Sequence, residues 1–140
     1  MAAREKRKDK DPMAEMRRDP MMAHLLDALK DGRDIGHYGR LTFVMVARQF
    51  IDSEEIVRLV MHDKDVDEAK ARALVQQVEE HDYNPPRRAR ILEWQAKQEF
   101  PIIPDPGDPD AGNVYRDLEM PDEVYENIEA YHEQRAGQHA

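Results

Sequence analysis

Apolar residues in this chain recur every three or four positions, in short runs that end at glycine or proline. One such run follows Asp19-Pro20 and ends at Gly32. An aspartate cap and a first-turn proline are typical of a helix start, and a glycine is typical of a helix end. No segment alternates apolar and polar residues as a half-buried strand does. The sequence therefore predicts an all-α protein, a single helical bundle of about six helices.

Five further helices are expected after the one that ends at Gly32. They cover residues 38–50, 54–61, 65–80, 87–98 and 121–134. The segment 38–50 is apolar around most of its circumference, which predicts a central, buried helix. Residues 100–121 contain five of the nine prolines, so we expect an extended or looped segment before the last helix.

The charge and proline patterns divide the chain into four parts. We expect a disordered basic arm at residues 1–12 and a helical core at residues 13–98. Residues 99–135 predict a Pro-rich acidic segment and a C-terminal helix that pack on this core, and residues 136–140 a disordered end. A chain of 140 residues is long enough for one such core.

Composition excludes several classes of site. The chain has no cysteine, which excludes disulfides, thiolate zinc sites and cysteine-held iron–sulfur clusters. Its six histidines show no metal-ligand spacing, and no hydrolase or Walker-type motif is present. No apolar run approaches membrane-spanning length, and the first residues lack the apolar core of a secretory signal. We expect a cytoplasmic, non-enzymatic protein with no cofactor, no metal and no membrane partner.

The net charge of -9 is unevenly distributed. Residues 1–50 carry 11 basic and 8 acidic side chains, residues 51–98 carry 8 and 11, and residues 99–140 carry 2 and 11. The acidity therefore belongs to the C-terminal third. This asymmetry is compatible with a local basic face on an acidic protein.

The segment 31–43, DGRDIGHYGRLTF, is a glycine-hinged entry into a helix. Free N–H groups and the helix dipole make such an entry favourable for anions. His37 and Arg40 are three residues apart, so they project from one helical face, with Arg33 nearby. We interpret them as a phosphate clamp; the alternative is a helix cap with a solvated arginine.

A second basic cluster follows the break at Tyr83-Asn84-Pro85-Pro86. Arg87, Arg88 and Arg90 stand at a predicted helix start, where the dipole disfavours cations, so they indicate an external anionic partner. A solubilising patch is the alternative. Trp94 would stack on a base, although a single tryptophan more often belongs to the core.

Three aspartates, Asp63, Asp65 and Asp67, imitate the first half of a calcium loop. The match fails because Glu68 stands where glycine is needed and Leu74 where the bidentate glutamate should be. We therefore interpret these acids as a turn and a helix cap.

Four motifs in order resemble the helical C-terminal domain of the large subunit of archaeal and eukaryotic DNA primase. They are His37-Tyr38-Gly39-Arg40, a glutamate-rich turn at 53–57, an acidic segment at 65–68, and Tyr83-Asn84-Pro85-Pro86. The resemblance covers residues 28–94. It implies a non-catalytic DNA-replication subunit that binds nucleic acid and positions a 5′-triphosphate end for a separate primase or polymerase catalytic subunit.

In that family the His and Arg of the first motif help to hold the triphosphate end, a role that falls on His37 and Arg40 here. The family also holds a [4Fe–4S] cluster on four cysteines, one of which aligns with Arg88, so this chain would be a cluster-free form. Replacement packing would come from residues 100–103 and the last helix. The alternative function is a protein-interaction or regulatory helical adaptor that uses the acidic C-terminal third.

Overall fold

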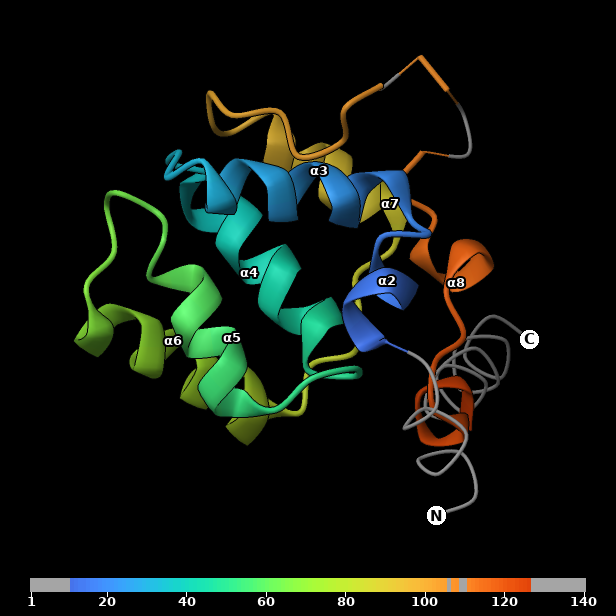
Figure 1. The fold of residues 1–140 in the computed structure, drawn as a ribbon. Helices are drawn as coiled ribbons and strands as arrows, with labels where there is room; N and C mark the ends of the chain where they lie inside the picture. Colours follow the sequence, from blue (N-terminus) through green and yellow to red (C-terminus); the bar gives the residue numbers. More distant parts are fainter. Residues whose placement is uncertain (1–10, 106, 109–110, 127–140) are drawn as a thin grey trace.

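A computed structural model describes residues 11–105, 107–108 and 111–126. The helices with described bounds are α2 (Pro12–Met16), α3 (Pro20–Lys30), α4 (Gly36–Ala47), α5 (Ser53–Val60), α6 (Glu68–His81), α7 (Arg88–Gln95) and α8 (Val114–Asp117). Residues 122–126 are also helical, and no strand occurs in the described part. The prediction of an all-α helical bundle is confirmed (Figure 1).

Aspartate side chains begin four of these helices. Each accepts a hydrogen bond of 2.8–3.0 Å from a backbone N–H two or three residues further along. Such a bond satisfies one of the N–H groups that a helix start leaves without an intrahelical partner. The four capping residues are Asp11, Asp19, Asp52 and Asp67.

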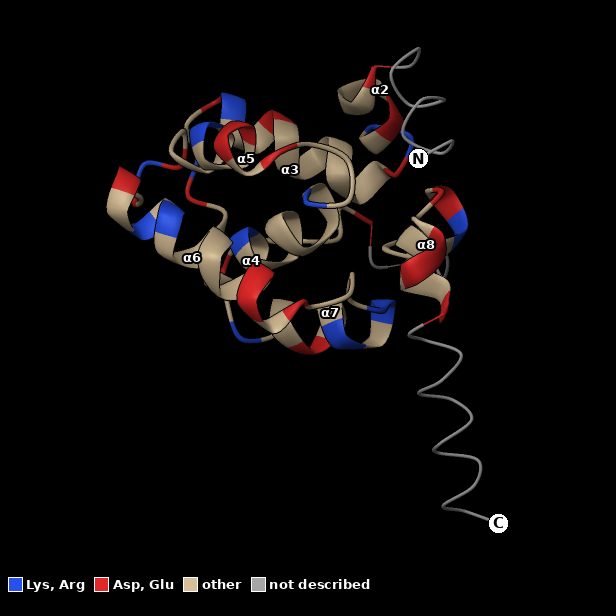
Figure 2. Ribbon diagram, turned by 90° about the horizontal axis from the view of Figure 1, so that it is seen from below, with Lys and Arg blue, Asp and Glu red and all other residues tan. Residues whose placement is uncertain are grey.

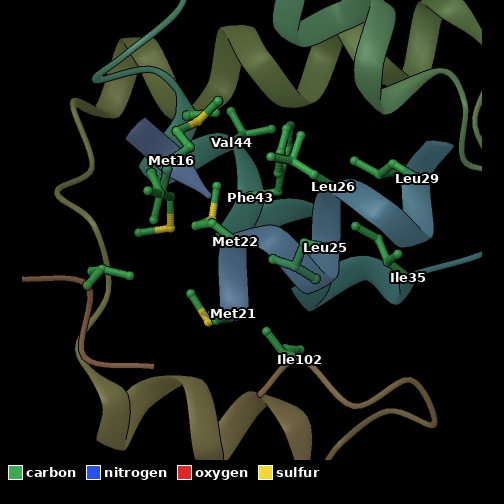
Figure 3. Packing of buried hydrophobic residues seen from close by; sticks show 14 of the residues in the cluster. Met16, Met21, Met22, Leu25, Leu26, Leu29, Ile35, Phe43, Val44 and Ile102 are labelled. Atoms are coloured by element: carbon green, nitrogen blue, oxygen red, sulfur yellow. The ribbon is translucent and has the colours of Figure 1, made fainter. Parts of the chain in front are cut away.

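Helix α4 occupies the centre of the bundle and packs against α3, α5, α6 and α7. Phe43, Val44, Val46 and Ala47 are fully buried, as the apolar circumference of this segment predicts. Figure 3 shows Phe43 beside Leu26 of α3 within the same cluster of apolar side chains. Removing these side chains from water is the main favourable term for the fold.

The chain returns to this core after α7. Ile102 and Ile103 are fully buried and Phe100 is 8% exposed, and all three belong to the same cluster as the α4 side chains. Val114 and Leu118, in and just after α8, belong to it as well. Much of the segment from 100 to 124 is thus packed on the helices rather than detached from them (Figure 1).

The structure differs from the expected helices in several places; α4, expected at 38–50, spans Gly36–Ala47. Helix α2 lies where no helix is expected, and α8 interrupts the segment that we expect to be extended. Helix α6 begins at Glu68 rather than at 65. Helix α7 ends at Gln95, whose side-chain Oε1 accepts a hydrogen bond of 2.7 Å from the Ile103 N–H.

Other expectations fall partly outside the description. The last helix, expected at 121–134, is helical at 122–126, and its remainder lies outside the described residues, as do residues 1–10 and 136–140. In the part of the chain that the structure describes, no helix combines the length and hydropathy needed to cross a bilayer.

A candidate binding surface at the start of α4

Two glycines shape the turn that connects α3 to α4. Gly32 has φ = 73° and Gly36 has φ = 80°, a left-handed conformation that side chains with a Cβ rarely adopt. A Cβ on Gly36 would also lie 2.5 Å from Oε1 of Gln98. Gly36 is therefore required both by its backbone conformation and by the close approach of another side chain.

The first N–H groups at this helix entry already have acceptors. The Ile35 N–H donates to Oδ2 of Asp63 at 3.0 Å, and the Gly36 N–H donates to Oδ1 of Asp34 at 2.8 Å. The sequence predicts that an external anion binds at this helix start, and this stays a prediction. The anions found there are two carboxylates of the protein itself.

Gln98 supplies the remaining contacts at this point. Its Oε1 accepts from the Tyr38 N–H at 2.9 Å, and its Nε2 donates to the carbonyl oxygens of Ile35 and Phe100 at 2.8 and 3.0 Å. The Gln98 side chain therefore caps α4 and also holds the segment after α7 against the start of α4.

Arg40 is bound internally. Its Nη1 lies 3.0 Å from Oδ2 of Asp63 and 3.1 Å from Oδ1 of Asp34. The Asp63 side chain is 0% exposed and that of Arg40 is 15% exposed. Because a buried carboxylate needs a compensating charge and hydrogen bonds, Arg40 links α4 to the loop between α5 and α6. The guanidinium that the sequence assigns to a phosphate is thus paired with two aspartates.

The acidic segment behaves as a turn and a cap, as we interpret it from the sequence. Oδ1 of the buried Asp63 accepts from the Asp65 N–H at 2.8 Å, and Asp67 caps α6. Among the described residues, no group of three or more histidine or carboxylate side chains is placed to hold a metal ion.

A hollow of about 500 Å³ lies at the glycine turn. Two cations and two acids line it, Arg33 and Lys64 with Asp34 and Glu99, so its charge is mixed. The Arg33 guanidinium lies 5.1 Å from the centroid of the Phe100 ring, which forms part of the wall. Of the predicted site residues, Arg33 is the one that lines this hollow.

Beside this turn, two aromatic rings stack on each other at the protein surface. Tyr38 of α4 and Trp94 of α7 have ring centroids 5.7 Å apart and planes inclined by 18°. The rings of His37 and Tyr38 are T-shaped, with centroids 5.2 Å apart, and the Lys97 ammonium lies 5.9 Å from the Tyr38 centroid. His37 and Lys97 are exposed, whereas Tyr38 and Trp94 are half-buried against the core. We call these four residues the aromatic surface.

This surface unites two residues that the sequence singles out separately. His37 and Trp94 both contact Tyr38, a residue to which the sequence analysis assigns no role. Trp94 is half-buried against the core, as the second of its two interpretations expects, and its stacking on a base stays a prediction. The adjacent pair His37-Tyr38 is the signal that a search for aromatic residues beside basic ones would have found.

The second basic cluster is distributed differently. Arg88 donates from Nε to the Ala111 carbonyl at 2.9 Å and from Nη2 to the Asp108 carbonyl at 3.2 Å, so it links α7 to the segment before α8. Arg90 is exposed and forms a loose ion pair of 3.8 Å with Glu93. Both signs of charge occur on α7, as Figure 2 shows.

Arg87 and Arg88 line a second hollow of about 450 Å³ with Ala89, Asn113, Tyr115 and Tyr125. The Tyr115 hydroxyl donates to the Pro85 carbonyl, and burial raises the pKa of this hydroxyl to about 12. Arg33 and Arg88 therefore lie in separate hollows, and His37, Arg40 and Trp94 line neither of the two.

Comparisons with protein-family models, curated proteins and solved structures find no match to this chain. The resemblance to the primase large subunit stays a prediction. The binding surface is thus argued from its own geometry.

Proposed function

We propose that this protein is a non-catalytic nucleic-acid-binding module that stacks unpaired bases on the aromatic surface. The observation that carries the proposal is the Tyr38–Trp94 stack with His37 and Lys97 beside it. Aromatic faces bind unpaired bases with little regard to sequence, at about 1–3 kcal/mol per base. Neighbouring cations then contact the phosphates.

The surface is built on two helices that are held firmly together. Gln98 joins the start of α4 to the chain after α7, and Ile91 of α7 is fully buried. Rings that are ordered before binding lose little conformational freedom when a base stacks on them. This rigidity favours a binding role for the surface.

The charges around the surface set the expected strength of binding. Three exposed cations are near in the chain or in space: Lys97 at the Tyr38 ring, Arg90 one turn before Trp94 on α7, and Arg33 at the glycine turn. The acids Glu93 and Glu99 occur on the same segments. At most about three phosphates would be neutralised, so log K should fall with log[salt] with a slope of about -2 for a single strand. The affinity should therefore be modest and strongly weakened by salt.

The narrower proposal, that the surface positions a 5′-triphosphate end for a primase or polymerase subunit, depends on Arg33 and the exposed His37. Arg40 is committed to Asp34 and Asp63. Preference for triphosphate over monophosphate ends would support this role. Equal binding of both ends would reject it and leave base stacking intact, and co-purification of a catalytic subunit would test the partner.

The experiment is fluorescence anisotropy with a labelled single-stranded oligonucleotide at low salt. Lys97→Gln and His37→Ala should each weaken binding several-fold. Lys70→Gln is the matched control, because Lys70 is an exposed lysine on α6, away from the surface. Equal affinities for the Lys97 and Lys70 variants would reject the proposal.

Two observations favour a protein-interaction adaptor as a second candidate. Arg33 and Arg88 do not share a hollow, and residues 99–126 carry eight described acids against Arg116 as the one described base. Reversing the exposed acids Asp122, Glu123 and Glu126 to lysine leaves the buried anchors of this segment in place. Loss of a cellular protein partner from that variant, with oligonucleotide binding unchanged, would support the adaptor.

A further inference from the structure

Two carboxyl groups lie within hydrogen-bond reach of each other where the C-terminal segment packs on α3: Asp19, which is buried, and Asp117, whose side chain is 14% exposed. Asp19 caps α3, is 0% exposed, and accepts from the Met22 N–H through Oδ2 at 2.9 Å. Its Oδ1 is buried, and no described residue donates a hydrogen bond to it. The same is true of Oδ2 of Asp117, at the end of α8.

Burial of Asp19 outweighs the attraction of the nearby Arg116. On α8, Arg116 lies 3.0 Å from Oδ1 of Asp117. Next to Asp19 along the chain, Arg17 is paired with Asp27 at 2.9 Å, and Arg18 is exposed. Two ionised carboxylates in one buried place repel each other and lack donors.

We propose that Asp19 and Asp117 share one proton, and that this proton holds α8 against the start of α3. The proton turns two opposed acceptors into an O–H···O⁻ hydrogen bond, which is a strong, charge-assisted one. Burial, reinforced by the neighbouring Asp117, raises the pKa of Asp19 from the ordinary 3.8 to about 7. Loss of the proton leaves two charges in contact and favours release of α8.

Release should be local, because α8 has four residues; its other anchors include the buried Val114 and Leu118 and the hydrogen bond from the Tyr115 hydroxyl to the Pro85 carbonyl. In the released state Asp19 would titrate near its ordinary pKa, so docking takes up one proton between about pH 4 and pH 7. The equilibrium constant for opening then rises about tenfold per pH unit in this window and levels off above it. Between pH 5.5 and 8.5 the rise is about 30-fold.

Hydrogen exchange of the full chain tests this directly. After correction for intrinsic rates, the amides of Leu118 and Asp117 should lose about 30-fold of their protection between pH 5.5 and 8.5. Asp19→Asn keeps an acceptor for the Met22 N–H and offers a permanent donor to Asp117, so its protection should not change with pH. Asp31→Asn, an exposed change at the other end of α3, should behave as the wild type.

Asp117→Asn serves as the second variant if Asp19→Asn folds poorly, because it supplies the same donor from the other side. A ¹³C-carboxyl titration of the wild type gives an independent readout, with a midpoint near pH 7 expected for Asp19. A midpoint below pH 5 would overturn the proposal. So would equal pH dependence of protection in the wild type and in both asparagine variants.

Discussion

Replacing Asp63 with asparagine tests how the start of α4 is held. The side chain is 0% exposed and accepts three hydrogen bonds. Oδ2 receives the Ile35 N–H and Nη1 of Arg40, each at 3.0 Å, and Oδ1 receives the Asp65 N–H at 2.8 Å. The asparagine side chain would match the shape of the carboxylate but would carry a single acceptor oxygen and no charge.

The cost can be worked out from these contacts. Whichever way the amide turns, its NH₂ group faces a donor, so at least one buried donor loses its partner at about 1–3 kcal/mol. Breaking a fully buried ion pair costs about 3–5 kcal/mol. Arg40 keeps its contact with Asp34 and is 15% exposed, which places the expected loss near the lower end, at about 2–3 kcal/mol. The melting temperature should fall by roughly 6–10 °C.

Urea denaturation measures this loss, with Trp94, the sole tryptophan, as the fluorescent probe. The control is Asp34→Asn, because that side chain is 41% exposed and its ion pair with Arg40 should contribute less than about 1 kcal/mol. The reasoning would be refuted if Asp63→Asn unfolded within about 0.5 kcal/mol of the wild type. A loss for Asp34→Asn as large as that for Asp63→Asn would refute it too.

Three further substitutions test contacts between distant segments, each by urea denaturation. Gln98→Ala removes the cap on the Tyr38 N–H and two bonds to carbonyls, and should cost about 1–2 kcal/mol; no loss would show that water replaces the amide. Arg88→Met keeps the apolar part of the side chain but loses the hydrogen bonds to the Ala111 and Asp108 carbonyls. The stability should fall by about 1–2 kcal/mol, and the affinity for the oligonucleotide should stay unchanged. A loss of affinity without a loss of stability would show that Arg88 binds the oligonucleotide. Gly36→Ala should lower the stability by about 2–3 kcal/mol and Gly32→Ala by about 1 kcal/mol. Both glycines have positive φ, but only a Cβ at Gly36 would collide with Gln98. Equal losses for the two variants would contradict this close approach.

The sequence predicts the helices best where their signals are local. The Asp52 and Asp67 caps lie three residues from the N–H groups they accept from, so both helix starts are readable from the chain. Helix α8 could not be predicted in this way, because it stands in a Pro-rich segment and is held by burial of Val114 and Leu118 in a distant core.

The site shows the same division between local and distant effects. Local reasoning predicts that the glycine-hinged helix start favours an anion, and in the structure an acidic side chain of the protein itself lies there. The anion is Asp63, 28 residues away from Ile35, and the cap is Gln98, 60 residues away from Tyr38. Only the folded chain brings these groups together, and the same holds for the stacking of Tyr38 on Trp94.

Emission from Trp94 during titration with a short single-stranded oligonucleotide tests the central claim most directly. A base that stacks on the aromatic surface should quench this emission in a saturable way. The apparent affinity should fall with salt along a slope of about -2, and double-stranded DNA should quench little. Emission that stays unchanged while the oligonucleotide binds, or an absence of binding at low salt, would contradict the account.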